Sequence, residues 1–253
     1  MFTRAITRNP GKNFAQGITT TFSSDPPNYE LILNQHESYL ETLNAIGLDI
    51  IQLESLPNFP DAYFVEDTAV VTSDVAVITN PGAESRKGEE KSIAAALAPF
   101  RESGRIQAPG TLDGGDVLQI GTHFLIGLSE RTNQEGAEQL GRFLEKFGNT
   151  WTTIQVGAGL HLKSSVNYVG KKTILVTDEF ANHEQLTGFD LIAVDKSEAY
   201  AANTLWVNGY LLTPKGYPDT RQKLEKLKSE IIELDTSEIR KMDGGLTCMS
   251  IRF

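Results

Sequence analysis

The sequence predicts an α/β fold built from similar units that close into a ring. Short apolar runs typical of strands alternate with amphipathic segments typical of helices along the whole chain. Several strand-like runs are paired around a tight turn, and a helix and a further strand follow. These groups recur about every 40 to 50 residues, a spacing typical of repeated units. The periodicity by itself slightly favours an ordinary mixed α/β sheet, so both arrangements stay open at this point.

Three segments have the pattern of amphipathic helices. Residues 28–46 place apolar side chains on one face, and Gly47 follows as a stop signal. Residues 133–147 follow Thr132, which has capping-box spacing to Glu135, and end before Gly148. A third helix is expected over residues 221–229.

Strands are expected where short runs are rich in β-branched and apolar residues. These runs are residues 63–71, 75–79, 117–120, 123–126, 173–176, 191–194, 204–207, 210–213, 231–234 and 247–253. Hairpin turns are expected at Gly121-Thr122, Gly170-Lys171 and Asn208-Gly209, because these residues tolerate tight turns between paired strands.

The composition is that of a globular protein, with 40% hydrophobic and 22% charged residues. No Pro- or Ser-rich linker divides the chain, so residues 1–253 are expected to form a single domain. No run approaches the roughly 20 apolar residues that a membrane span requires. The first ten residues lack the basic-then-apolar order of a signal peptide. These features predict a cytoplasmic protein with no membrane partner.

The net charge of −10 argues against a nucleic-acid partner, because proteins that bind nucleic acids present basic surfaces. An acidic protein attracts cations over long range, so the charge is compatible with a cationic small-molecule substrate. Many proteins are acidic for solubility alone, and the charge does not choose between these explanations.

The chain has one cysteine, Cys248, which excludes an internal disulfide. A lone cysteine is most often a small buried apolar residue, and its reactivity depends on stabilisation of the thiolate. Four histidines are present, but no CxxC or HExxH spacing accompanies them. The sequence therefore predicts no metal site.

Two acidic segments interrupt otherwise apolar surroundings. Asp61, Glu66 and Asp67 lie in or beside the strand-like run at 63–71, where charged residues are costly to bury unless they are paired. A solvated edge would explain them, and so would a carboxylate pocket for a planar cation such as a guanidinium. In the second segment, Asp113 and Asp116 flank two glycines that allow a sharp turn and aim both acids.

Two further segments supply a base and a nucleophile. His161 stands between two leucines and would point away from them on a strand, although a lone histidine is more often structural than catalytic. Cys248 follows a second Asp-Gly-Gly turn close to the end of the sequence. One thiol, one imidazole and several carboxylates are the parts of a nucleophile–base–orienter set, but the sequence does not show that they meet.

Six of these short motifs, taken together and in this order, resemble the dimethylarginine dimethylaminohydrolase family. They are residues 60–67 (PDAYFVED), 81–86 (PGAESR), 112–117 (LDGGDV), 131–133 (RTN), 160–163 (LHLK) and 243–248 (DGGLTC). The family belongs to the guanidine-modifying superfamily that includes arginine deiminase. The resemblance implies a five-bladed α/β propeller and hydrolysis of Nω-methylated arginine to citrulline and a methylated amine.

The resemblance also implies a catalytic set. Cys248 would attack the guanidinium carbon as a thiolate, and His161 would protonate the departing amine and then activate water. Asp113 would orient His161 and favour its charged form. Some relatives have a glutamate in place of this aspartate.

The remaining implied residues bind the substrate. Glu66 and Asp67 would hold the guanidinium. Arg86 and Arg131 would bind the α-carboxylate and Asp61 the α-amino group, while main-chain atoms of Ile18 and Met242 would complete the pocket. Residues 17–27, which are rich in Thr, Ser and Pro, are expected to form a lid that excludes water. No cofactor is implied, and a homodimer is left open.

Two other functions are compatible with the same residues. Another hydrolase of this superfamily could act on arginine or citrulline instead of methylated arginine. A catalytically silent amino-acid-binding module would keep the pocket but would not need Cys248, His161 and Asp113 together.

Overall fold

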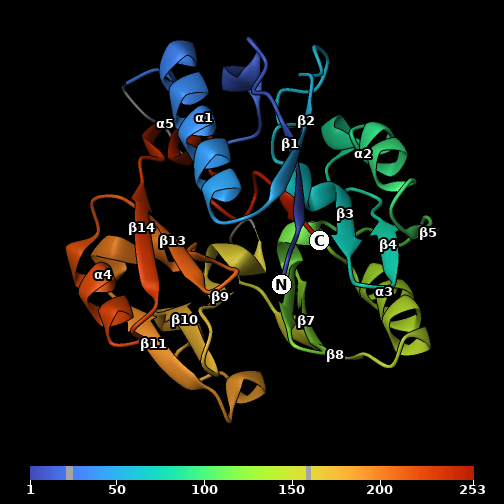
Figure 1. Ribbon diagram of the computed structural model, residues 1–253. Helices are drawn as coiled ribbons and strands as arrows, with labels where there is room; N and C mark the ends of the chain where they lie inside the picture. Colours follow the sequence, from blue (N-terminus) through green and yellow to red (C-terminus); the bar gives the residue numbers. More distant parts are fainter. Residues whose placement is uncertain (21–24, 158–160) are drawn as a thin grey trace.

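The computed structural model describes residues 1–20, 25–157 and 161–253, and it confirms the predicted ring of α/β units. Within these ranges the strands form five three-stranded sheets, in the orders β15-β1-β2, β3-β4-β5, β6-β7-β8, β9-β10-β11 and β12-β13-β14. Figure 1 shows the sheets arranged around a common centre, with α1, α2, α3 and α4 on the outside. The arrangement is that of a five-bladed α/β propeller.

The elements are short, as expected for blades of a propeller. The strands are β1 (Arg4–Arg8), β2 (Asp49–Leu53), β3 (Ala69–Val71), β4 (Val75–Ile78), β5 (Glu102–Arg105), β6 (Val117–Ile120), β7 (His123–Leu128), β8 (Thr150–Gln155), β9 (Val166–Tyr168), β10 (Thr173–Thr177), β11 (Asp190–Val194), β12 (Leu205–Val207), β13 (Tyr210–Pro214), β14 (Glu230–Leu234) and β15 (Ile251–Arg252). The α-helices are α1 (Tyr29–Ala45), α2 (Glu90–Leu97), α3 (Gln134–Lys146), α4 (Pro218–Glu225) and α5 (Ser237–Lys241).

The five sheets share one internal plan. A short inner strand pairs antiparallel with a middle strand, and the middle strand pairs in parallel with an outer strand. Parallel neighbours require a crossover connection, and a helix supplies it in four of the five sheets. In the β9–β11 sheet the described connection contains two 3₁₀ turns, Asp178–Phe180 and Glu184–Leu186.

The two ends of the chain close the ring. β15, from the C-terminal end, pairs antiparallel with β1, from the N-terminal end, so that Ala5 lies opposite Arg252 and Ile6 opposite Ile251. β15 also contacts β3 of the next sheet, and β9 contacts the inner strands β6 and β12. The inner strands therefore face the centre of the ring.

A 3₁₀ helix precedes each inner strand from β3 to β12. These helices are η2 (Val65–Thr68), η4 (Gly114–Asp116), η5 (Leu162–Ser164) and η8 (Lys196–Ala202). Consecutive members contact one another around the ring. The turn that precedes β15 contains Cys248. Residues far apart in the sequence are thereby brought to equivalent places on neighbouring blades.

The start of α3 corrects one prediction. The side chain of Asn133 caps this helix by accepting a hydrogen bond from the N–H of Gly136 at 2.8 Å. Thr132 is buried instead, and its Oγ1 donates to Asp116 Oδ2 at 2.7 Å. The predicted capping box of Thr132 and Glu135 is wrong because Asp116 takes the threonine hydroxyl.

The other helices agree with the sequence to different degrees. The helix expected at 28–46 is α1, capped by Asn28, which accepts from Leu31 N–H at 3.1 Å. The helix expected at 221–229 lies earlier, because Pro218 occupies the first turn of α4. The pattern did not predict α2 or α5, which are only 8 and 5 residues long.

Two predicted strands are mostly turns. In the run at 63–71 only β3 is a strand, and residues Val65 to Thr68 form η2. All four residues of η2 are buried, which a strand facing alternately inward and outward does not achieve. In the run at 247–253 only β15 is a strand. The sequence also missed β1 and the outer strands β2, β5 and β8, in which polar residues interrupt the apolar ones.

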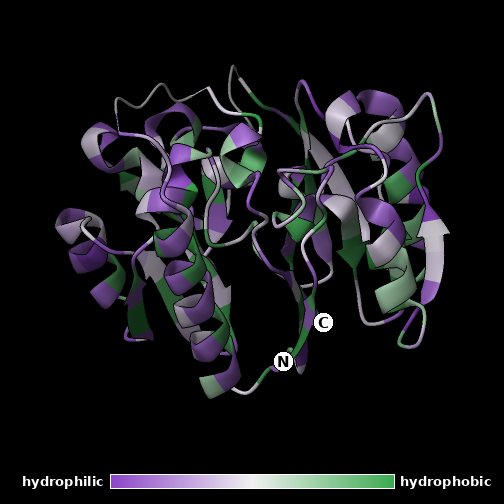
Figure 2. Ribbon diagram, turned by 90° about the horizontal axis from the view of Figure 1, so that it is seen from above, coloured by the Kyte–Doolittle hydropathy of each residue, from purple (hydrophilic) through white to green (hydrophobic). Residues whose placement is uncertain are grey.

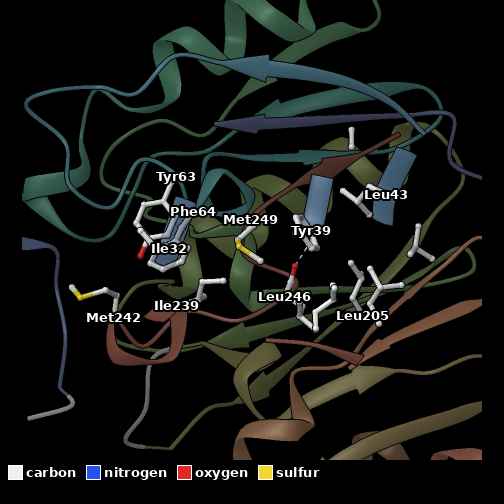
Figure 3. Packing of buried hydrophobic residues seen from close by; sticks show 14 of the residues in the cluster. Ile32, Tyr39, Leu43, Tyr63, Phe64, Leu205, Ile239, Met242, Leu246 and Met249 are labelled. Atoms are coloured by element: carbon white, nitrogen blue, oxygen red, sulfur yellow. Dashed lines mark hydrogen bonds between the residues drawn. The ribbon is translucent and has the colours of Figure 1, made fainter. Parts of the chain in front are cut away.

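The core is divided among hydrophobic clusters that lie between neighbouring sheets. Figure 2 shows hydrophobic residues in the strands and hydrophilic residues on the outward side of the helices. In one cluster, drawn in Figure 3, Tyr39 of α1 packs inward and its hydroxyl donates to the carbonyl of Leu246 at 2.9 Å. None of the helices in the described ranges is both long and apolar enough to cross a bilayer.

We expect Gly136→Ala to destabilise the protein. A Cβ at this position would collide with the backbone carbonyl of Thr111, in the segment that leads to Asp113. Overpacking against backbone costs about 1–3 kcal/mol, more than the roughly 1 kcal/mol that alanine gains over glycine in a helix. Urea denaturation measures the change. Arg142→Ala, on the exposed face of α3, is the control, and equal stability of the two variants would contradict the packing argument.

Candidate active site

The turns that precede the inner strands surround a cavity of about 260 Å³. Each of the five blades contributes lining residues. Among these are Glu66, Gly115, His161, Asn203 and Cys248. The structure therefore brings the thiol and the imidazole to one cavity, although 87 positions separate them in the sequence.

His161 is held by two carboxylates. Its Nε2 lies 3.0 Å from Asp113 Oδ2 and 3.8 Å from Asp67 Oδ1, and both aspartates are buried. Burial on its own would lower the pKa of His161, but the charge of Asp67 and the hydrogen bond to Asp113 raise this pKa to about 9. The imidazole is therefore protonated at neutral pH.

Glycine at position 115 makes this close packing feasible. A Cβ there would come within 2.7 Å of Asp67 Oδ1 and of the His161 ring. The backbone N–H of Gly115 donates to the same Asp67 oxygen at 2.9 Å. The Asp-Gly-Gly-Asp turn thus allows the backbone to approach both the base and the acid.

The two aspartates are saturated with hydrogen-bond donors. Asp113 Oδ1 accepts from the N–H of Gly82 at 3.0 Å, while its Oδ2 faces His161. Asp67 accepts from Gly115 and forms an ion pair with Arg86. Among the described residues Asp67, Asp113 and His161 are the one set close enough to hold a metal ion, but these donors already account for all four carboxylate oxygens.

Cys248 lies in the turn before β15 and is partly exposed. Its N–H donates to Gly245 at 3.2 Å, and its carbonyl accepts from the N–H of Glu66 at 3.1 Å. Burial, followed by the negative charges of Glu66 and Asp67, raises the pKa of the thiol to about 12. The sulfur is therefore a neutral thiol in the substrate-free protein at neutral pH.

Glu66 presents one unused oxygen. Its Oε1 accepts from Lys163 Nζ at 2.7 Å and from Arg252 at 3.1 Å. Its Oε2 is buried and has no hydrogen-bond partner among the described residues. A buried carboxylate oxygen without a donor is unfavourable, so a ligand N–H that reached it would be bound strongly.

Arg86 is fully engaged within the protein. Its guanidinium donates to Glu89 and Asp67, and also to the carbonyls of Asp61 and Phe64. Burial alone would raise the pKa of Asp67, but the charges of His161 and Arg86 outweigh burial and lower that pKa to about 2. Asp67 is therefore an anion beside the imidazole at neutral pH.

The other residues predicted to contact the substrate, namely Ile18, Asp61, Arg131 and Met242, are not among the described residues that line this cavity. The N–H of Ile18 donates to both oxygens of Asp61, at 3.1 Å each. Arg131 follows β7, and its backbone packs so closely on Gly82 that no Cβ would fit there. Met242 is buried at the end of α5. The predicted lid includes residues 21–24, which lie outside the described residues, as do residues 158–160 before His161.

Sequence reasoning missed several polar residues of the site. Lys163 and Arg252 were given no role, yet both bind Glu66. Asp116 was noted only as part of a turn, and it accepts from the N–H of Leu162 at 2.8 Å, beside His161. Asn203 donates to the carbonyl of Lys163 at 2.9 Å. Their position in the chain was the available signal. Asp116, Lys163 and Asn203 lie just before inner strands, as the predicted site residues do, and Arg252 lies in the inner strand β15.

Comparison with known proteins agrees with this geometry. Residues 55–209 match the arginine deiminase family. The chain is 42% identical to N(G),N(G)-dimethylarginine dimethylaminohydrolase of Pseudomonas aeruginosa over the full length of both chains. The chain belongs to the dimethylarginine dimethylaminohydrolase family. The family member of Streptomyces coelicolor is 34% identical, over 98% of this chain and 96% of its own.

Solved structures of the dimethylarginine dimethylaminohydrolase family superimpose on the whole chain. A cysteine-to-serine variant of the Pseudomonas aeruginosa enzyme in complex with citrulline matches with a TM-score of 0.97 and 41% identity, covering all of both chains. A histidine-to-glycine variant, solved as an adduct with S-methyl-L-thiocitrulline, matches equally well. The N-terminal domain of the arginine dihydrolase ArgZ matches with a TM-score of 0.88 over 98% of this chain and 97% of its own, and its 15% identity shows the fold alone.

The raised pKa of His161 predicts how stability depends on pH. The folded protein favours the protonated imidazole, because this pKa rises from 6.5 to about 9. The resulting stabilisation is fully present below pH 6.5 and is lost as the pH rises through about 9. Relative to His161→Gln, the wild type should lose roughly 3 kcal/mol of unfolding free energy across that interval.

Urea denaturation of both proteins at several pH values measures this loss. His123→Gln, which changes a histidine on β7 away from the cavity, is the control and should keep the wild-type pH dependence. If the difference in unfolding free energy between the wild type and His161→Gln stays constant from pH 6.5 to about 9, the carboxylates do not hold a proton on His161.

Proposed function

We propose that this protein hydrolyses Nω-methylated arginine, both asymmetric dimethylarginine and monomethylarginine, to citrulline and dimethylamine or methylamine. The proposal rests on one observation above all: a lone, partly exposed thiol and a protonated imidazole line the same cavity, together with the carboxylate of Glu66. It is supported by the relatives of known name, which match the chain from end to end. The enzyme is a hydrolase acting on a guanidino C–N bond.

Glu66 and Asp67 bind the guanidinium in this proposal. The free Oε2 of Glu66 accepts one substrate N–H, and the anionic Asp67 adds a second negative charge. A guanidinium matches carboxylates through parallel, charge-assisted hydrogen bonds. The cavity-lining carboxylate of Glu66, with Asp67 buried beside His161, therefore selects a planar cation over a neutral amide.

The amino-acid end of the substrate lies farther from the thiol. Asp61 receives the α-amino group, and Arg86 and Arg131 receive the α-carboxylate. Main-chain atoms of Ile18 and Met242 complete this end. Because Arg86 is saturated by Asp67 and Glu89, it acts on the carboxylate chiefly through its charge unless substrate displaces one of these partners.

The first chemical step forms a covalent intermediate. Binding of the cation favours loss of the Cys248 proton to solvent, because it offsets the charges of Glu66 and Asp67 that raise the pKa of the thiol. The sulfur then bonds to the guanidinium carbon. The C–N bond to the methylated nitrogen breaks as His161 transfers its proton to the departing amine, which would leave poorly as an anion.

The second step releases citrulline. Neutral His161, still oriented by Asp113, takes one proton from a water molecule, and the water oxygen bonds to the carbon of the S-alkylthiouronium cation. The C–S bond breaks, sulfur leaves as thiolate, and the second water proton passes to solvent. The urea group of citrulline carries the water oxygen, and His161 is again protonated.

We infer that residues 1–253 work as one catalytic domain, since the pairing of β15 with β1 joins the two ends of the chain beside the cavity. The cytoplasmic location stays a prediction from the sequence, and a homodimer stays an open alternative. The chemistry of the donor set needs neither a metal nor another cofactor.

Cys248→Ser is expected to abolish turnover while binding survives. Serine keeps the shape of the side chain but is a far weaker nucleophile, so citrulline release from asymmetric dimethylarginine should fall at least ~10³-fold. A colorimetric citrulline assay measures turnover, and calorimetric titration with citrulline measures binding. Turnover by the serine variant at the wild-type rate would remove Cys248 from the mechanism.

The substrate preference separates this proposal from its alternatives. We expect kcat/KM to be highest for the two methylated arginines, lower for arginine and undetectable for citrulline. Amine and ammonia release from the four compounds under equal conditions measures the order. Faster ammonia release from arginine would assign an arginine deiminase activity, and binding of all four without turnover would indicate an amino-acid-binding module.

A further inference from the structure

Arg252, the penultimate residue of the sequence, contacts Glu66, which is proposed to bind the substrate. It also contacts the turn before β15 that contains Cys248, called here the Cys248 turn. Its guanidinium donates to Glu66 Oε1 at 3.1 Å and to the carbonyls of Thr247 and Ser250 at 3.3 and 2.7 Å. A further bond reaches Ser250 Oγ at 2.7 Å. Thr247 and Ser250 stand on either side of Cys248 in the sequence.

We propose that Arg252 is a positioning residue for the hydrolysis of the guanidinium group, holding the Glu66 carboxylate and the Cys248 turn in one fixed arrangement. The inference rests on the proposed function. Arg252 touches no reacting atom and acts through the two groups that it joins.

The effect on Glu66 follows from the way its oxygens are used. Arg252 and Lys163 both bind Oε1, so the carboxylate cannot rotate without losing two charge-assisted bonds. Oε2 is consequently kept free and buried.

The effect on Cys248 follows from the length of the turn. Only the residues from 242 to 250 separate α5 from β15, and they contain no regular strand or α-helix. Arg252 ties the carbonyls of Thr247 and Ser250 together, while the hydroxyl of Tyr39 holds Leu246 at 2.9 Å and Ser250 Oγ at 2.6 Å. Three residues of the turn, Leu246, Thr247 and Ser250, are thus fixed on the two sides of the nucleophile.

Arginine suits this place better than lysine. Its rigid fork directs one terminal nitrogen to Glu66 and the other to the carbonyls of the turn. A lysine ammonium carries the same charge but is a point donor on a flexible stem, so it could not hold both groups in one geometry.

The test compares Arg252→Met with Arg101→Met. Methionine keeps much of the apolar stem and removes every donor. Arg101 lines the same second cavity of about 790 Å³ as Arg252, but it donates to Thr72 and Phe100 and contacts neither Glu66 nor the Cys248 turn. Steady-state kinetics with asymmetric dimethylarginine and thermal denaturation are measured for both variants and for the wild type.

We expect Arg252→Met to lower kcat/KM by roughly 10- to 100-fold, as the loss of charge-assisted hydrogen bonds in a buried site predicts. The fall in kcat should exceed the rise in KM, because the placement of the sulfur matters most in the bond-forming step. Arg252→Lys should recover only part of the loss, and Arg101→Met should match the wild type. A role limited to stability would instead lower Tm and leave kcat per folded molecule unchanged.

Wild-type kinetics in Arg252→Met would overturn the inference and leave the proposed function intact. Absence of citrulline release from the wild type would overturn both. If Arg252→Met does not fold, the same kinetics and thermal denaturation are measured for Arg252→Lys, with Arg101→Lys as its control. A lower kcat at wild-type Tm then supports the inference, and an unchanged kcat overturns it.

Discussion

The antiparallel pairing of β15 with β1 is the constraint on which the rest of the structure depends. It completes the fifth sheet and draws the C-terminal end of the chain into the ring. Cys248 lies just before β15, so the same pairing sets the distance between the sulfur and the groups on the other blades. Its carbonyl accepts a hydrogen bond from the N–H of Glu66, at the start of the η2 turn. Ring closure and assembly of the site are therefore one event.

Equivalent turns on successive blades explain how so many charges are gathered at the centre. Glu66 and Asp67 lie in η2, Asp113 directly before η4 and His161 directly before η5. Turns in front of the inner strands let consecutive side chains point inward, which an alternating strand forbids. The charges then compensate one another: Asp67 faces Arg86 and His161, while Glu66 faces Lys163 and Arg252. Buried charges persist because each has a partner.

Local patterns predicted the middle strands β4, β7, β10 and β13, the hairpins and the long helices, because these elements carry continuous apolar runs or stripes, but they missed the middle strand β1. They failed for the polar outer strands and for η2, since Glu66 and Asp67 are buried for electrostatic reasons that hydrophobic periodicity does not register. The meeting of Cys248 and His161 depends on ring closure and was accessible only through the motif resemblance. The roles of Lys163 and Arg252 were not predicted, because both residues neutralise the carboxylate of Glu66. An ion pair between blades leaves no spacing pattern in the sequence.

The resting state of the thiol gives the site a physical basis for selectivity. A cysteine whose pKa is about 12 is a poor nucleophile at neutral pH, and burial together with the two carboxylates proposed to bind the substrate holds that pKa up. The same carboxylates are neutralised when a guanidinium enters, so the ligand that is attacked is also the ligand that activates the attack. A neutral compound of similar shape would fill the cavity without removing the repulsion between the sulfur and Glu66 or Asp67. In the proposed mechanism, selection for a cation is thereby exerted on the bond-forming step as well as on binding, and it follows from the burial of the thiol and the placement of the charges around it.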